Sequence, residues 1–376
     1  MKKSFIFICS CMLIMASIIG SVSGFHGMKK PSQSLFPGET FYVGGSGPGN
    51  FSKIQDAIDA ASDGDTVFVY NDASPYFENL VIEKSITLEG EDKETTRILG
   101  DESSDFVIVN ISADDVTVSG FTIQPNSGRP DGIGIGRNYT YPDYWNIDII
   151  KNISIANTVI RKTGRGIFGI RLKYADIYAN KVENCDGTGI LLFISSDTSI
   201  TNNVVANCSY RGIVIDGLWN PYRLMNSRNP IPENNIVSQN MVRSNRWGIQ
   251  VNGGARNTEI SRNNITDNHE EGLRLYQVSK TKIIENNFIN NKKNAYFAVI
   301  CALRYPQFLQ NSWENNYWDK SRTAPVHING TFYFIPFPRL PFSISFPNYD
   351  FNFKELSWIA FDWHPSQQPY HITVGV

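Results

Sequence analysis

The chain has 376 residues, of which 41% are hydrophobic and 19% are charged. This balance is typical of folded proteins and excludes a largely disordered chain, and the length suffices for one large domain or two ordinary ones. The formal net charge of −2 gives no sign of a nucleic-acid partner. The 29 glycines and the frequent asparagines favour many turns over long helices.

The N-terminus has the pattern of a secretory signal peptide. Two lysines precede an apolar run over residues 5–19, and two small serines that suit cleavage follow it. The run is shorter than the roughly 20 residues of a membrane-spanning helix, and a retained N-terminal anchor is the alternative. We therefore expect a signal peptide over 1–23, a linker over 24–40, and a secreted or cell-surface protein, periplasmic or extracellular.

One amphipathic helix is predicted near the start of the mature chain. Ser52 and Gln55 have the spacing of a capping box, and Gly64 marks the stop. The apolar face of this helix consists of Ile54, Ala57, Ile58 and Ala61. Because a solenoid exposes its apolar core at each end, such a helix is well placed to cap the N-terminal end of a repeat array.

Five related phrases follow, each with a glycine before a short apolar strand. The steps between these glycines are 23, 23, 36 and 24 residues, for the series Gly166, Gly189, Gly212, Gly248 and Gly272. Apolar and polar residues alternate over four or five positions, which predicts short strands. We expect an all-β, right-handed single-stranded parallel β-helix with three strands and about 23 residues per coil. Residues 41–135 have the pattern of earlier, less regular coils.

Two asparagine series run through the repeats. One series is Asn180, Asn203, Asn240, Asn264 and Asn287, and the other is Asn184, Asn207, Ser244, Asn268 and Asn291. We expect both to be structural, because asparagine tolerates the left-handed conformation of a sharp bend and stacked amides bond along the axis. Cys185 and Cys208 stand one coil apart, and we expect two buried thiols because parallel stacked side chains seldom have the torsion of a disulfide.

The segment "FYVGGSGPGNFSKIQDAIDAASDGDTVFVYNDASPYFENLVIEKSITLEGED" resembles the opening of secreted prokaryotic NosD-like β-helix repeat proteins, within the pectin-lyase-like superfamily. The asparagine-rich coils and the closing "ENNYWD" over 314–319 are similar too. The resemblance implies a parallel β-helix over 41–318. It implies no catalytic residue, because the superfamily includes polysaccharide lyases, glycoside hydrolases, binding proteins and accessory factors linked to copper-site maturation, and no catalytic motif is matched.

Residues 319–376 are aromatic and rich in proline, which predicts a C-terminal cap over the end of the repeats. His327, His364 and His371 all lie in this segment. Copper sites use histidine, cysteine or methionine clusters, so these histidines are weak candidates for a metal site. Scattered surface histidines are the plainer explanation, and we assign no metal ligand with certainty.

The strands after the repeated glycines present a set of outward positions: Leu191, Phe193, Val214, Asp216, Gln250, Asn252, Arg274 and Tyr276. Asp216 and Arg274 are the acid and the base of this face, and are therefore the candidates for catalysis in a glycosidase or a lyase. A cluster of carboxylates for calcium is not visible in this set. Ile213, between these positions, should point into the core.

Two insertions, over 136–149 and 219–232, start at the same turn of their coils. A third break in the repeats covers 301–313. The first two carry six aromatic residues: Tyr139, Tyr141, Tyr144, Trp145, Trp219 and Tyr222. Aromatic rings beside a polar strand face suit the apolar faces of sugars, whereas packing of the rings on one another is the alternative. The predicted glycan-binding residues are Tyr141, Tyr144, Trp145, Trp219, Tyr222, Gln250, Asn252 and Tyr276.

From the sequence we expect a monomeric extracellular protein that binds a polysaccharide or other glycan along one strand face. A polysaccharide lyase or glycoside hydrolase on the same face is the first alternative, with calcium as its cofactor if it is a lyase. A copper-related accessory protein, as the NosD-like resemblance implies, is the second alternative. A structural surface repeat protein is the third.

Overall fold

The computed structural model describes residues 38–100, 107–136, 148–217, 231–300, 310–334 and 354–375. The chain divides into residues 1–31 and 32–376, and every described residue belongs to the second unit. In the described ranges no helix is long and apolar enough to cross a membrane.

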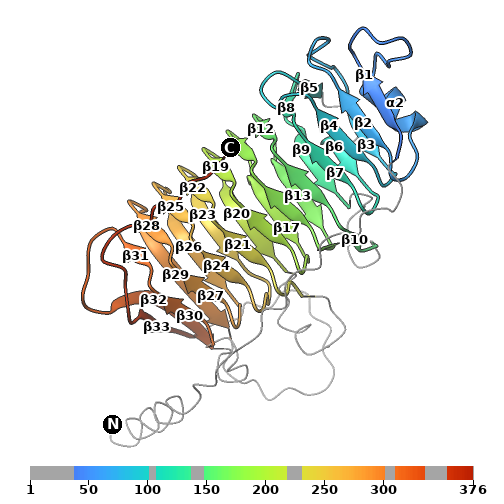
Figure 1. Ribbon diagram of the computed structural model, residues 1–376. Helices are drawn as coiled ribbons and strands as arrows, with labels where there is room; N and C mark the ends of the chain where they lie inside the picture. The colour runs from blue at the N-terminus through green and yellow to red at the C-terminus, as the bar shows by residue number, and fades with distance from the viewer. Residues whose placement is uncertain are drawn as a thin grey trace, which may run out of the picture. The chain divides into compact units, whose positions relative to one another are not determined.

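Three sheets of stacked strands build the second unit (Figure 1). Sheet A consists of β1 (Thr40–Val43), β2 (Thr66–Val69), β4 (Thr87–Gly90), β7 (Thr117–Ser119), β11 (Ser154–Ala156), β15 (Asp176–Tyr178), β18 (Ser199–Thr201), β21 (Ile236–Ser238), β24 (Glu259–Ser261), β27 (Lys282–Ile284) and β30 (Ser312–Glu314). Sheet B consists of β5 (Arg97–Gly100), β8 (Thr122–Pro125), β12 (Val159–Arg161), β16 (Lys181–Glu183), β19 (Val204–Ala206), β22 (Met241–Arg243), β25 (Asn264–Thr266), β28 (Asn287–Ile289) and β31 (Tyr317–Trp318).

Sheet C carries the predicted site. It consists of β3 (Leu80–Ile82), β6 (Val107–Ile111), β9 (Asp131–Ile135), β13 (Ile167–Ile170), β17 (Ile190–Phe193), β20 (Arg211–Asp216), β23 (Trp247–Val251), β26 (Glu271–Tyr276), β29 (Lys293–Ile300), β32 (Val326–Phe334) and β33 (Lys354–Asp362). All of its pairings are parallel except that of β32 with β33. A small pair, β10 (Ile150–Lys151) and β14 (Leu172–Lys173), lies apart from the three sheets.

From β4 to β32 each coil gives one strand to each sheet, as in β15, β16 and β17, which confirms a parallel β-helix with three strands per coil. The register reproduces the predicted steps. Ile190 pairs with Ile213, 23 residues later, and Ile213 pairs with Ile249, 36 residues later. Ile249 pairs with Leu273, 24 residues later.

The repeated glycines stand where the chain passes close to its neighbouring coil. A Cβ atom on Gly189 would lie 2.4 Å from Cγ1 of Val205 and 2.8 Å from the carbonyl oxygen of Gly212. Any side chain here would displace a core residue and the next strand, so only glycine fits. The apolar side chains beyond it, such as Ile190 and Ile213, have no exposed surface and belong to one continuous core.

The first asparagine series forms a buried ladder, but the prediction for its last two members was wrong. The ladder consists of Asn180, Asn203, Asn240, Asn263, Asn286 and Asn316, all without exposed surface. Side-chain hydrogen bonds of 2.9–3.1 Å join each to the next. Asn264 and Asn287 are instead the first residues of β25 and β28. Each of these coils contains two consecutive asparagines, and only the inward one joins the ladder.

The ladder asparagines are not the bend residues either. The positive φ angles, 54–57°, belong to the residue before each of them: Ala179, Asn202, Gln239, Arg262, Glu285 and Asn315. The backbone therefore bends one position earlier, and the ladder asparagine is required for its hydrogen bonds rather than for its tolerance of left-handed backbone.

The second series divides between bends and a second ladder. Asn184, Asn207 and Ser244 have φ angles of 55–57°, as predicted for bend residues. Asn268 and Asn291 instead continue a ladder from Asn245, with side-chain hydrogen bonds of 3.3 and 2.8 Å. In two preceding coils the inward position is occupied by Cys185 and Cys208. Both are buried free thiols, as expected.

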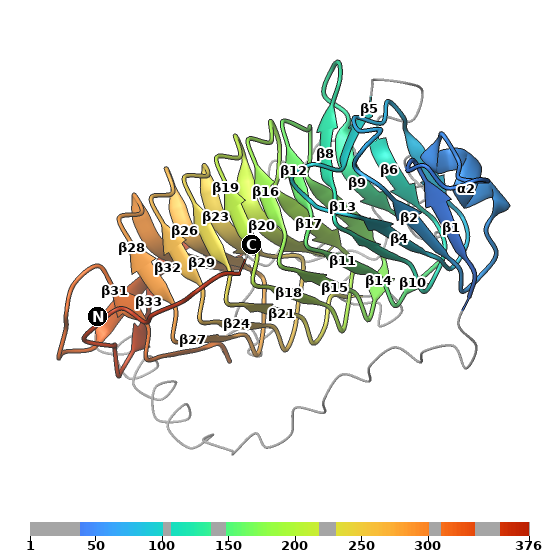
Figure 2. The same ribbon diagram turned by 45° about the horizontal axis from the view of Figure 1, so that its top comes forward.

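The helix α2 (Ile54–Ala60) closes the N-terminal end, beside β1 and β2 (Figure 2). Its predicted apolar face is buried, but the predicted capping box does not form. The carboxylate of Glu78 instead accepts hydrogen bonds from the backbone N–H groups of Ile54 and Gln55, at 2.8 and 2.9 Å. A carboxylate at a helix N-terminus also favours the helix dipole, so this distant residue replaces the local cap.

Beyond residue 318 the chain continues sheet C. Strand β32 pairs parallel with β29, and β33 returns antiparallel to β32. Trp358 of β33 packs on Phe332, with ring centroids 4.8 Å apart. The domain boundaries at 40 and 318, and the assignment of 319–376 as a cap, remain predictions.

Candidate functional site

The register gathers the predicted outward residues of sheet C into two rows along the solenoid. In the first row, Leu191 pairs with Val214, Val214 with Gln250, and Gln250 with Arg274, and Tyr296 of β29 follows. In the second row, Phe193 pairs with Asp216, and the same register places Asn252 and then Tyr276 in the next two coils. The structure thus brings together the described members of the predicted site.

Val214 departs from the expectation for an outward residue. Its side chain has no exposed surface, like that of the inward Ile213 beside it. Gln250 and Asn252 are also buried, with 6% and 9% of their surface exposed. Alternation along the strand therefore gives the direction of these side chains correctly but not their exposure.

A polar network connects the two rows. The Nε2 atom of Gln250 donates a hydrogen bond of 2.7 Å to Oδ1 of Asn252, which stands beside Asp216 in the second row. The Oε1 atom of Gln250 is buried and has no hydrogen-bond partner among the residues that the structure describes. A buried acceptor without a donor carries a desolvation penalty of about 1–3 kcal/mol, so this face gains stability when a ligand or solvent group donates to Gln250.

Burial shifts the pKa values of Asp216 and of the neighbouring Arg211. It raises the pKa of Asp216 above its ordinary value, while the polar side chain of Asn252 and the charge of Arg211 act in the opposite direction. Burial likewise lowers the pKa of Arg211, and Arg274 lowers it further, whereas Tyr210 and Asp216 raise it. The charged forms of both groups are therefore penalised by their surroundings.

Arg274 is a cation without an acidic partner among the described residues. Within the described ranges no hydrogen bond or ion pair involves its guanidinium, and its charge lowers the pKa values of Arg211 and Lys293. Burial is the main cause of the lowered pKa of Lys293, which Glu271 opposes. Three cations therefore lie near one another across four coils, and an anion placed at Arg274 would relieve their mutual repulsion.

The sequence analysis missed a group of rings and charges at the start of these strands. The guanidinium of Arg211 lies 4.1 Å from the ring centroid of Tyr210, and the ring of Tyr210 meets that of Trp247 edge-on at 4.9 Å. Nε1 of Trp247 donates a hydrogen bond of 2.7 Å to Glu271. Arg211, Trp247 and Glu271 each directly precede one of the repeated glycines. This shared position in the repeat is the sequence feature from which the group could have been predicted.

The aromatic half of the predicted site lies outside the described residues. This applies to Tyr139, Tyr141, Tyr144, Trp145, Trp219 and Tyr222. Their roles in glycan binding therefore remain predictions. The described half of the predicted site consists of Asp216, Gln250, Asn252, Arg274 and Tyr276.

The three candidate histidines do not form a common ligand set. His327 lies on β32, His364 follows β33, and all three side chains are exposed. Nδ1 of His371 lies 3.3 Å from Oγ1 of Thr373. In the described part of the chain, no group of three or more histidine, cysteine, aspartate or glutamate residues has the geometry to hold a metal ion.

Comparison with known proteins adds evidence on the fold. Residues 108–288 match the family described as right handed beta helix region. The fold is a right-handed parallel β-helix. No curated protein sequence is significantly similar to the chain.

Several solved structures are similar to the chain, with low sequence identity. The A-module of the mannuronan C-5 epimerase AlgE6 of Azotobacter vinelandii is 17% identical, with a TM-score of 0.48, over 71% of this chain and 83% of that one. The pectate lyase Pel9A is 13% identical, with a TM-score of 0.47, over 76% and 81% of the two chains. The Dettilon tailspike protein is 14% identical, with a TM-score of 0.47, over 70% and 58%.

Proposed function

We propose that the protein binds a glycan along the outer face of sheet C, over β20, β23, β26 and β29. The observation that carries this proposal is the unpaired, buried Oε1 atom of Gln250 within a row of side chains that donate and accept hydrogen bonds. Glycan hydroxyl groups both donate and accept, so one hydroxyl can satisfy Gln250 while its oxygen accepts from a neighbouring donor.

Rings flank this polar face, which suits a sugar better than a purely polar ligand. Tyr276 and Tyr296 belong to neighbouring coils on the face, and Trp247 stands at the start of β23. Aromatic rings cover the apolar faces of sugar rings while polar groups meet the hydroxyls. The predicted aromatic residues of the 136–149 and 219–232 insertions would extend the same arrangement.

Arg274 gives the proposed ligand a second property. A guanidinium without an acidic partner, next to Arg211 and Lys293, favours a ligand that carries an anionic substituent. We therefore expect acidic glycans to bind more tightly than neutral glycans of equal length, and the difference to shrink as salt is added.

A carbohydrate-active enzyme on the same face is the second candidate, and one observation favours it. Burial raises the pKa of Asp216, which is the property of a carboxyl group that acts as a general acid. A glycosidase needs a second carboxylate about 5–9.5 Å away, and neither row of this face supplies one. Binding without cleavage is therefore the better-supported function.

The setting of this function follows from the sequence alone and is part of the proposal. The N-terminal signal pattern supports a position outside the cell or on its surface, and we propose that the protein acts there as a monomer. A NosD-like, copper-related role would need metal ligands, and the exposed His327, His364 and His371 are the candidates that we retain for it.

A glycan array followed by product analysis tests the proposal. The purified protein should bind acidic oligosaccharides, and each bound oligosaccharide should keep its length after incubation. Shortened or unsaturated products would replace the binding function with the enzymatic one. Failure to bind any glycan would refute both, and metal analysis of the same preparation would then test the copper-related role.

A further inference from the structure

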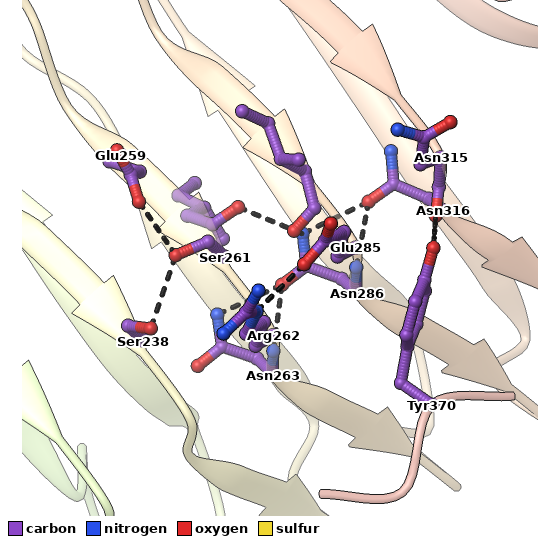
Figure 3. A network of polar contacts seen from close by, with 12 residues as sticks. Ser238, Glu259, Ser261, Arg262, Asn263, Glu285, Asn286, Asn315, Asn316 and Tyr370 are labelled. Carbon is purple, nitrogen blue, oxygen red and sulfur yellow. Dashed lines mark hydrogen bonds and ion pairs between the residues drawn. The ribbon is translucent and has the colours of Figure 1, made fainter. Parts of the chain in front are cut away.

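All six asparagines of the first ladder point the same way along the solenoid. The backbone N–H and one Nδ2 hydrogen of each of the first five donate to Oδ1 of the next asparagine toward the C-terminus, as Asn263 does to Asn286 at 2.9 Å in both bonds (Figure 3). The other Nδ2 hydrogen donates to a carbonyl of the preceding coil, Val237 in the case of Asn263. The side-chain amide dipoles are therefore aligned, with their N–H ends toward the C-terminus.

Aligned amides strengthen one another, as in other hydrogen-bond chains. Partial positive charge collects at the end where the last N–H groups have no further amide to meet, by the same reasoning that applies to a helix N-terminus. In this ladder that end is Asn316. At the opposite end, Oδ1 of Asn180 accepts from the backbone N–H of Thr158, at 3.1 Å.

A buried carboxylate occupies the positive end. The backbone N–H and Nδ2 of Asn316 each donate to Oδ2 of Asp362 at 3.0 Å, and Nε1 of Trp318 donates to the same oxygen at 3.1 Å. Asp362 has no exposed surface and forms no ion pair with a described residue. A buried carboxylate without a counter-charge is costly, so its negative charge is met by these donors and by the backbone N–H of His364, which donates to Oδ1 at 3.3 Å.

The second ladder ends in the same way. Asn291 donates from Nδ2 to Oδ1 of Asn294, at 3.2 Å, and Asn294 donates from Nδ2 to a carboxylate oxygen of Asp319, at 2.6 Å. Two ladders at different corners of the solenoid thus finish on an aspartate at their N–H ends. Asp319 is exposed, so only the first ladder fixes a fully buried charge.

We propose that the first ladder is a polarised array whose C-terminal end is a carboxylate-binding site, and that Asp362 fills this site to hold residues 354–375 against the last coil. The neighbouring contacts place the segment there. The backbone N–H of Ser366 donates to the carbonyl of Asn316 at 2.9 Å. The Tyr370 hydroxyl donates to the carbonyl of Asn315 at 2.7 Å, as Figure 3 shows. Tyr370 also exchanges two backbone hydrogen bonds with the side chain of Asn287.

Hydrogen–deuterium exchange of the full-length protein tests the role of the charge. The Asp362→Asn variant keeps the shape of the side chain but removes its charge, and it should speed the exchange of the Ser366 and Tyr370 amides at least about tenfold. The control Asp63→Asn alters an exposed carboxylate that accepts one backbone N–H, from Ser85, near the other end. It should leave both amides unchanged, and equal exchange in the parent and Asp362→Asn would overturn the proposal.

A double-mutant comparison tests whether the charge is held by the whole ladder. Asn263→Ser interrupts the first ladder, and Asn268→Ser interrupts the second ladder in the same coil. The further effect of Asp362→Asn on Ser366 and Tyr370 should fall below about threefold in the Asn263→Ser background and stay near tenfold in the Asn268→Ser background. Equal effects in the two backgrounds would show that Asp362 senses only its nearest donors. Should Asn263→Ser not fold, Asn203→Ser interrupts the same ladder five steps from Asp362.

Discussion

Replacing Ile213 by alanine tests the strand phase on which the site depends. Ile213 has no exposed surface and is stacked between Ile190 and Ile249 in adjacent coils. The substitution removes three carbon atoms, worth about 2.4 kcal/mol at roughly 0.8 kcal/mol for each buried CH₂ group. The flanking strands are fixed by backbone hydrogen bonds and cannot collapse into the space, so the cavity brings the total loss of unfolding free energy to about 3–5 kcal/mol.

Val214→Ala is the matched comparison, and the structure changes what we expect of it. The sequence predicted a small loss for an outward residue, but Val214 is buried, so removal of two carbon atoms should cost about 1.6 kcal/mol. Urea unfolding followed by far-ultraviolet circular dichroism gives both values, and exchange of the Ile190 and Ile249 amides reports local loosening. A loss for Val214→Ala equal to or larger than that for Ile213→Ala would refute the inward assignment of Ile213.

Three further predictions concern the site, the glycine stack and the N-terminal cap. Because burial raises the pKa of Asp216, its ionised carboxylate destabilises the folded protein once the pH exceeds the ordinary pKa of 3.8. The Asp216→Asn variant should therefore have a higher Tm than the parent at pH 7 and an equal Tm below pH 3.8. A lower Tm of the variant at pH 7 would contradict this prediction. Gly189→Ala should cost about 1–3 kcal/mol of unfolding free energy, because its Cβ would meet Val205, and an unchanged urea midpoint would count against the close approach. Glu78→Gln should cost about 1 kcal/mol and speed amide exchange in α2, and unchanged exchange would contradict the capping role of Glu78.

The repeat could be predicted from the sequence because the physics that sets it is local. A step of 23 residues and the alternation around Gly189 and Gly212 are enough to fix which residues stack. The sequence did not show in the same way which asparagine of each coil belongs to the ladder. Gly248 and Gly272 are 24 residues apart, whereas the ladder residues Asn240 and Asn263 are 23 apart, because the extra residue enters between Asn268 and Gly272.

Contacts between distant segments were beyond the sequence analysis. Glu78 caps α2 from 24 residues away, and Asp362 meets Asn316 from 46 residues away. In the site, alternation placed Asp216, Gln250 and Arg274 on one face. It gave neither the burial of Gln250 nor the ring contacts of Arg211, because these depend on how neighbouring coils pack.

Isothermal titration calorimetry with an acidic oligosaccharide identified on the array tests the central claim most directly. The parent protein should bind it, and Gln250→Leu and Arg274→Gln should each weaken binding at least about tenfold, the loss expected when a ligand group loses its buried partner. The control Arg243→Gln changes an exposed arginine on β22 in sheet B, and should bind like the parent. Unchanged affinity in both sheet C variants, with correct folding shown by circular dichroism, would contradict the assignment of the ligand to this face.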